Sequence, residues 1–316
     1  MDRKKKELLE LLSKTEMLYR SSLDLNLSDL FGIEIEYSKA LRTDVDNYIE
    51  NNHNNWKSID EKQITSGDKF GGEVISPILT DSEKTWSEIE EVLDNLKELG
   101  CSSNLAASHI HFDSSLVPYD LNVYYDLLKL WCIFETEIYQ FSYGELDKIR
   151  EQAYYFAYPI KGQITHNKMH LEQLMRVLKN LSKEYTQDEL LEANIQLFIL
   201  SYLGSRFNGL SFNCIKHAYS ESNNTFEVRT PNGTLDKVIW QNNINFFAKF
   251  LTYFKREYDK EFIDYHFDRL TKNETLLNKY DVEKAIILRD MIFKDETDKL
   301  YFMKQYTKSL KFDTKK

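Results

Sequence analysis

The chain has 316 residues, of which 42% are apolar and 14% aromatic, enough for one large hydrophobic core. Its 41 basic and 51 acidic residues give a net charge of −10, so bulk electrostatic attraction to nucleic acid or to an anionic membrane is not expected. The 3 cysteines lack metal-ligand spacing, which predicts reduced thiols in a cytoplasmic protein. Charges interrupt the first leucines, so we expect no signal peptide, and nothing later resembles a membrane span.

The N-terminal part of the chain predicts a helix, a strand and a loop. Residues 2–19 carry leucines at helical spacing and predict an amphipathic flanking helix. The stretch FGIEIEYSK, residues 31–39, alternates apolar and polar residues, so in a strand Glu34 and Glu36 share the face opposite the large apolar side chains. Residues 41–68 are polar and rich in Asn, Asp and Lys, which indicates an irregular connection.

A second strand and a helix follow. FGGEVISPIL, residues 70–79, predicts a short strand that Pro77 closes. Thr80 and Glu83 have the spacing of a capping box, and apolar residues recur at helical spacing from Trp86 onward. Gly100 is well placed to end this helix.

Two more segments place polar residues at alternate positions. In ASHIHFD, residues 107–113, His109 and His111 share one strand face. Helical patterns then dominate from 120 to 203. The stretches LSFNCIKHAYS and NTFEVRT, joined by a turn-prone sequence, predict a hairpin in which Glu227 and Arg229 share a face.

The C-terminal part is predicted to be helical after Gly233. Its aromatic stripe is interpreted as core and not as a ligand site, as is Cys132 in the middle of an earlier apolar run. The stripe consists of Phe246, Phe247, Phe250 and Phe254.

Three strands therefore carry the same pattern, a pair of polar residues at positions i and i+2. In a single antiparallel sheet these pairs gather on one face, while Ile, Val and Phe fill the other. The solvated faces of ordinary strands favour Thr, Lys and Gln, whereas carboxylates, imidazoles and guanidinium groups bind cations and phosphates. Two neighbouring carboxylates on one strand also repel each other, and a divalent cation removes that penalty. The pattern predicts a metal site on this face.

The order of these motifs resembles that of the putative amidoligase family, which is related to glutamine synthetase and glutamate-cysteine ligase. The similar stretches are FGIEIEY, GGEVISP, SHIHF, RFNGLSFN and TFEVRTPNGTLD, from about residue 31 to about residue 240. The resemblance implies an α+β fold, a curved antiparallel sheet of the glutamine synthetase catalytic-domain type with helices on its convex side. Residues 1–30 would be an N-terminal helical flank, 31–240 the catalytic domain and 241–316 a helical annex packed on it.

By the same resemblance, five side chains are expected to be metal ligands. Glu34 and Glu36 resemble a pair in which each glutamate serves a different ion, and Glu73 is similar to a further carboxylate ligand. His109 and Glu227 are expected to complete the cluster around Mg²⁺, with Mn²⁺ as the other candidate ion.

The remaining roles concern nucleotide and phosphate. His111 resembles the histidine nearer the nucleotide, and Arg229 a phosphate and transition-state clamp. Arg206 is similar to an arginine that binds phosphate or the acid substrate, and Asn213 is a further candidate for nucleotide binding. Together with Glu34, the two arginines are the expected catalytic residues.

Simpler interpretations of single residues stay open. Glu73 could hold a basic side chain at a strand edge, and because it has the same parity as Ile75 its direction is not fixed. His111 could be an ordinary hydrogen-bonded histidine and Arg206 a surface ion-pair residue.

The resemblance implies a ligase that uses ATP and Mg²⁺ to join a small-molecule or peptide carboxylate to an amine through an acyl phosphate, forming an amide or isopeptide bond. The sequence leaves the acid, the amine and the oligomeric state open. Two alternatives remain, a metal-dependent hydrolase that uses the His and Glu cluster, and a non-catalytic nucleotide-binding protein on the same scaffold.

Overall fold

The computed structural model describes most of the chain. The described residues are 7, 10–12, 14–61, 69–103, 106–143, 156–181, 205, 207–212, 215, 224–272 and 281–308.

A six-stranded sheet forms the centre of the fold, with the strand order β2-β3-β1-β4-β6-β5 and antiparallel pairing between all neighbours. Its strands are β1 (Phe31–Leu41), β2 (Lys57–Ile59), β3 (Phe70–Ile75), β4 (Ser108–Asp113), β5 (Leu210–Ser211) and β6 (Thr225–Val228). The fold is α+β with one open antiparallel sheet, as the sequence predicted at this level.

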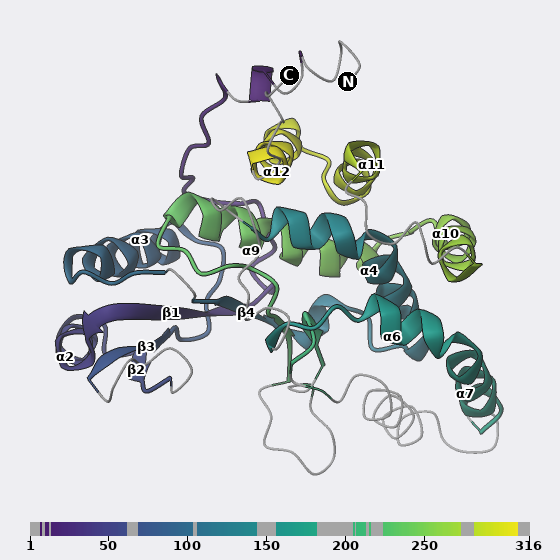
Figure 1. The fold of residues 1–316 in the computed structure, drawn as a ribbon, viewed down its shortest axis with the longest axis horizontal. Helices are drawn as coiled ribbons and strands as arrows, with labels where there is room; N and C mark the ends of the chain where they lie inside the picture. Colours follow the sequence, from purple (N-terminus) through teal and green to yellow (C-terminus); the bar gives the residue numbers. More distant parts are fainter. Residues whose placement is uncertain are drawn as a thin grey trace, which may run out of the picture.

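Helices account for most of the remaining described residues. They are α2 (Arg42–Asn52), α3 (Glu83–Glu98), α4 (Leu121–Phe141), α6 (Lys161–His166), α7 (Lys168–Leu181), α9 (Lys237–Thr252), α10 (Lys260–Lys272), α11 (Val282–Ile292) and α12 (Glu296–Lys308), with two 3₁₀ turns, η1 (Ser114–Leu116) and η2 (Tyr253–Lys255). Figure 1 shows α3, α9 and α4 along one face of the sheet, with α10, α11 and α12 farther out on the same side. Among the described helices, none combines the length and apolar character that crossing a membrane requires.

The core lies between the sheet and these helices. Residues of β1 alternate as predicted, so Phe31, Ile33 and Ile35 are buried against the helical layer while the polar positions between them remain partly accessible. The ring of Phe31 stacks on Trp86 of α3 at a centroid distance of 5.8 Å. The predicted core role of the aromatic stripe and of Cys132 is confirmed, since Phe246, Phe247, Phe250, Phe254 and Cys132 are all buried.

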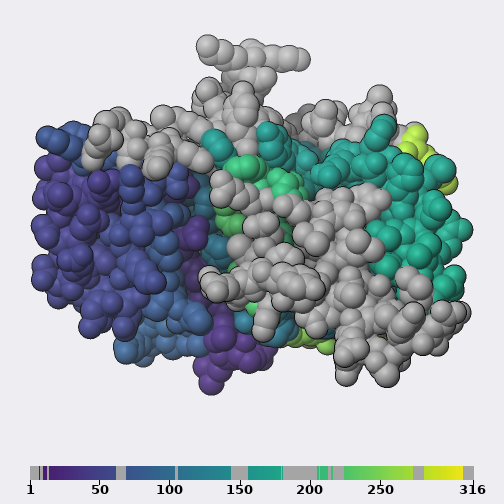
Figure 2. Space-filling model, turned by 90° about the horizontal axis from the view of Figure 1, so that it is seen from below, coloured from purple at the N-terminus to yellow at the C-terminus, as the bar shows by residue number. Residues whose placement is uncertain are grey.

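The second face of the sheet is the one that carries the polar pairs. Seen from the side away from the outer helices, the first third of the chain, in purple and blue, lies on one side of the molecule and the segment 156–181, in teal, on the other, with green atoms of the segment near 230 visible between them (Figure 2). This face is therefore flanked by chain segments on both sides.

The connection after β1 differs from the prediction of an irregular stretch over 41–68. Residues 42–52 form α2 and residues 57–59 form the edge strand β2. Val45 and Ile49 lie on one face of α2 and are buried, and the partly buried Tyr48 packs against the same core, so a few apolar residues dock a mostly polar helix. The part of this connection between 62 and 68 lies outside the described residues.

The start of α3 also differs from the prediction. The helix itself and its end are confirmed, with Gly100 in the left-handed region at φ 81°. The N-cap is Ser82, whose side chain accepts from the backbone N–H of Thr85, so the capping box predicted at Thr80 and Glu83 is wrong. Asp81 next to it is buried and binds the N-terminal part of the chain.

Residues 17–25, the N-terminal strap, cross from α3 to the last helix. The backbone N–H of Leu23 donates to Asp81 at 2.9 Å. Arg20 pairs with buried Asp298 of α12 at 2.8 Å, and its backbone N–H donates to Gln241 of α9 at 2.8 Å. The chain just before β1 is therefore tied to helices from the other end of the sequence.

Candidate metal and phosphate site

The antiparallel register places the predicted polar residues opposite one another. On β1, Glu34 is the partner of His109 on β4, and Glu36 is the partner of Glu73 on β3. His111 is in turn the partner of Glu227 on β6. Because directly opposed residues of an antiparallel pair point to the same side, these side chains share one face of the sheet.

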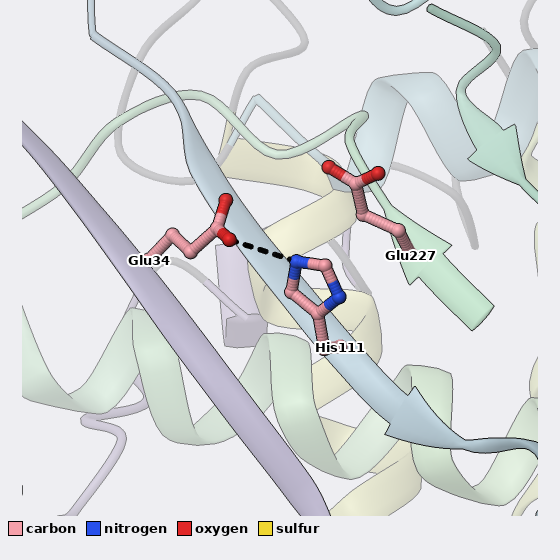
Figure 3. Close-up of side chains that lie close together, drawn as sticks. All are labelled: Glu34, His111 and Glu227. Atoms are coloured by element: carbon pink, nitrogen blue, oxygen red, sulfur yellow. Dashed lines mark hydrogen bonds and ion pairs between the residues drawn. The ribbon is translucent and has the colours of Figure 1, made fainter. Parts of the chain in front are cut away.

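Glu34 is the centre of this face. One carboxylate oxygen, Oε2, lies 3.1 Å from Nδ1 of His109, and the other, Oε1, lies 2.9 Å from Nε2 of His111. Figure 3 shows Glu34, His111 and Glu227 approaching one another from three adjacent strands. A single carboxylate thus bridges both histidines that the sequence singled out.

Two groups of potential metal ligands overlap at Glu34. One consists of Glu34, Glu73 and His109, and the other of Glu34, His111 and Glu227. In each group the ligand atoms lie within 4.8 Å of one another. The structure settles the direction of Glu73, which faces Glu36 and Glu34 together with Ile75, and no ion pair joins it to a basic side chain among the described residues.

The carboxylates crowd one another. Burial raises the pKa of Glu73 to about 9, and the charges of Glu34 and Glu36 add to this effect. Burial alone would also raise the pKa of Glu34, but its hydrogen bonds with His109 and His111 outweigh it and hold that pKa far below the usual range. In the metal-free protein near neutral pH, these shifts favour an ionised Glu34 beside a protonated Glu73.

The histidines complete the donor set. Burial would lower the pKa of His111, but its hydrogen bond with Glu34 and the charge of Glu227 raise it above the usual value. Nε2 of His109 is buried without a hydrogen-bond partner among the described residues, 3.7 Å from Oε1 of Glu36. A buried imidazole nitrogen without a partner beside crowded carboxylates fits a divalent cation, which accepts the lone pair and compensates the charges.

The state of Glu73 gives a pH-dependent expectation. In an unfolded chain its pKa is near 4.5, so between pH 4.5 and about 9 unfolding releases a proton and the fold loses stability as pH rises. Glu73→Gln removes this titration. The metal-free variant should be more stable than wild type at pH 8 by on the order of 1–3 kcal/mol, with no gain near pH 4.5.

Urea unfolding with a chelator across this pH range measures the difference. The titration of Glu34 is present in both proteins, so their difference isolates Glu73. Glu98→Gln, at an exposed position near the end of α3, is the matched control and should follow wild type. A difference that does not change with pH would show that Glu73 is ionised in the folded protein.

Glu36 and Arg229 are held by backbone groups. The backbone N–H of Ala107 donates to Oε2 of Glu36 at 2.6 Å. Arg229 follows directly after β6 and contacts Glu227 through Nη1, while its Nε donates to the carbonyl of Phe156 at 2.9 Å. The side chain of Arg229 is only 14% exposed, so this is not a solvated surface ion pair.

A cavity of about 480 Å³ adjoins the Glu34 and His111 end of the face. Its wall includes Gly32, which lies on the same side of β1 as Glu34 and leaves space beside His111. A charge of each sign, Lys57 and Asp113, also lines the cavity. The site therefore continues into a hollow large enough for part of a nucleotide or a similar ligand.

The sequence reasoning located most of these residues but not all. Arg206 and Asn213 lie outside the described residues. Thr225, whose hydroxyl lies 3.1 Å from Nδ1 of His111, was missed, although it stands two positions before Glu227 on the same strand face. Extending the alternation by two residues would have found it, whereas the carbonyl of Phe156 has no sequence signal.

The face thus combines clustered carboxylates, two imidazoles and a guanidinium, the composition of a site for divalent cations and phosphate groups. Residues 18–251 match the family described as putative amidoligase enzyme, and the chain belongs to this family. No curated protein and no solved structure matches the chain. Family membership supports an enzyme that ligates its substrates.

Proposed function

We propose that this protein is an ATP- and Mg²⁺-dependent carboxylate-amine ligase that releases ADP and forms an amide or isopeptide bond. The convergence of Glu34 with both His109 and His111, within a chain of the amidoligase family, is the observation that carries the proposal. Mn²⁺ is the other ion that suits this donor set.

Two cation positions follow from the two overlapping ligand groups. Glu34, Glu73 and His109 would hold one ion, and Glu34, His111 and Glu227 the other. Bound there, the ions would neutralise charge on the triphosphate and on the phosphoryl group being transferred. Glu34 would belong to both positions, and Glu36 stands beside the first.

The proposed reaction has two transfers. An oxygen of the substrate carboxylate attacks the terminal phosphorus of ATP, the bond to the bridging oxygen breaks, and ADP leaves. The amine then attacks the carbonyl carbon of the acyl phosphate, the carbon–oxygen bond to the phosphate breaks, and inorganic phosphate leaves with its electron pair. The amine nitrogen gives up a proton to solvent. Arg229, and by resemblance Arg206, would stabilise negative charge on the phosphoryl oxygens in both transfers.

The cavity beside Gly32 is the place we propose for the nucleoside of ATP. It opens from the Glu34 and His111 end of the cluster and leads away from Glu73 and Glu36, so a triphosphate lying over the carboxylates can extend its sugar and base into it. The acid and the amine would then approach from the Glu73 side.

Filling the cavity tests this placement. A Cβ at Gly32 would lie 3.6 Å from Ser76 Oγ, an ordinary contact, so Gly32→Ala and Gly32→Val should fold. Each added carbon takes cavity space, and the dissociation constant of MgATP should rise in that order, to about tenfold or more for valine. Gly162→Ala on α6, where a Cβ meets nothing within 4 Å, is the matched control.

Calorimetry with MgATP measures the nucleotide affinity, and electron paramagnetic resonance with Mn²⁺ measures the metal affinity separately. Metal affinity should be unchanged in all of these variants. Unchanged ATP affinity in Gly32→Val would contradict the placement of the nucleoside in the cavity.

The proposed function is tested by a screen of amino acids, polyamines and peptides for ADP release that requires both an acid and an amine, with product masses measured. Phosphorus NMR of a turnover mixture should show ADP and phosphate. AMP with pyrophosphate would overturn the acyl-phosphate route. Metal-dependent hydrolysis without nucleotide would identify the hydrolase instead, and tight MgATP binding without any turnover would identify a binding protein.

A further inference from the structure

The guanidinium of Arg229 is oriented by a chain segment remote from β6 in sequence. Its Nε donates to the carbonyl of Phe156 at 2.9 Å, so the direction of the guanidinium depends on where that carbonyl lies. The same segment pairs with the chain just before β5, because Tyr158 N–H donates to Phe207 at 2.6 Å and Gly209 N–H donates to Tyr158 at 2.9 Å. The backbone N–H of Arg229 donates to Gly209 at 2.9 Å, so Arg229 contacts both sides of this pairing.

Helix α4 fixes the segment with two buried side chains one turn apart. The hydroxyl of Tyr139 donates to the carbonyl of Ala157 at 2.6 Å. The carboxylate of Glu135 accepts from the N–H groups of Ile160 at 2.7 Å and Lys161 at 3.1 Å. Ala157 and Ile160 are completely buried, so the backbone between Phe156 and α6 is held on α4 by both hydrogen bonds and packing.

The approach of Tyr139 requires the glycine opposite. A Cβ at position 209 would lie 2.3 Å from the hydroxyl of Tyr139, closer than any real contact. Gly209 therefore leaves room for Tyr139 to reach Ala157, the residue next to the carbonyl that orients Arg229. Tyr139, Tyr143 and Ala157 form a small apolar cluster separate from the main core, so this support is local.

We propose that Tyr139 is a positioning residue for the phosphate clamp: its hydroxyl fixes the Phe156–Ala157 backbone, which in turn fixes the guanidinium of Arg229. The inference rests on the proposed function for the role of Arg229 in turnover. Tyr139 itself is not one of the proposed metal ligands.

Tyr139→Phe deletes only the hydroxyl and keeps the ring in its cluster. We expect kcat to fall about tenfold or more, because the guanidinium is no longer held where charge develops, while KM for ATP changes by less than about threefold. Tyr124→Phe is the matched control on the same helix, since the buried Tyr124 hydroxyl has no hydrogen-bond partner among the described residues, and its kcat should equal that of wild type.

A double-mutant cycle separates positioning from general damage. In an Arg229→Lys background, Tyr139→Phe should lower kcat by less than about twofold, because the group through which it acts is already absent. An equal loss in both backgrounds would mean that Tyr139 acts independently of Arg229.

NMR of protein labelled at the arginine side-chain nitrogens tests the same inference without turnover. The Nε–H signal that disappears in Arg229→Lys should exchange slowly with solvent in wild type and in Tyr124→Phe, and markedly faster in Tyr139→Phe. An unchanged exchange rate in Tyr139→Phe would overturn the positioning role whatever the enzyme does. A wild-type protein without ligase turnover would overturn the proposed function and leave this readout intact.

Discussion

Glu34→Gln is expected to abolish ATP turnover, lowering kcat by on the order of a thousandfold or more. Glu34 is the only member shared by the two ligand groups found among the described residues, so its loss weakens both cation positions at once. An amide keeps the size of the side chain but removes the charge that the cations require. Mn²⁺ binding, followed by electron paramagnetic resonance, should weaken at both positions.

The variant must also be judged for folding. Glutamine replaces an ionised partner of His109 and His111, so the metal-free variant should lose about 1–3 kcal/mol of unfolding free energy. Turnover is therefore compared well below its melting temperature, with Glu98→Gln as the control that loses a charge elsewhere. Wild-type turnover in a folded Glu34→Gln protein would contradict both the proposed role of Glu34 as a metal ligand and the proposed mechanism.

Arg229→Lys is expected to lower turnover by on the order of a hundredfold or more while leaving MgATP affinity within a modest factor. The planar fork of arginine contacts Glu227 and Phe156 together and presents its donors in a fixed direction, whereas lysine is a point charge. Lysine keeps the positive charge beside Glu227, so the variant should melt close to wild type.

Steady-state kinetics with saturating substrates and a thermal melt check both parts. Arg289→Lys, in which the replaced arginine pairs with Asp290 on the surface of α11, is the matched control and should have wild-type turnover. Full activity in Arg229→Lys would show that Arg229 is not needed for turnover and has only a structural role beside Glu227.

The site face could be predicted because strand alternation is a local property. The pairs Glu34 with Glu36 and His109 with His111 alternate with the apolar residues that form the core, so burial of the apolar residues turns both pairs to the opposite face. Glu73 could not be placed in this way, because either parity of β3 fits its sequence. Only the register that pairs Glu73 with Glu36 determines its side.

The elements that were wrong or missed depend on tertiary contacts. Helix α2 is mostly polar and docks by Val45, Ile49 and the partly buried Tyr48, a signal too weak to separate from a loop. Ser82 caps α3 while Asp81 before it binds the strap, and local spacing does not reveal this long-range contact. The carbonyl of Phe156 is a backbone acceptor, which every residue has, so no residue type marks it.

The strap also bears on how the chain folds as it is synthesised. Arg20 and Asp298 are 278 positions apart, and the Leu18 N–H bonds to Tyr301 across 283 positions. On a ribosome, the contact of the strap with Asp81 can form early, whereas its contacts with Asp298 and Tyr301 can form only after α12 has emerged. A nascent chain that still lacks α12 therefore holds the segment leading into β1 by fewer contacts than the folded protein does.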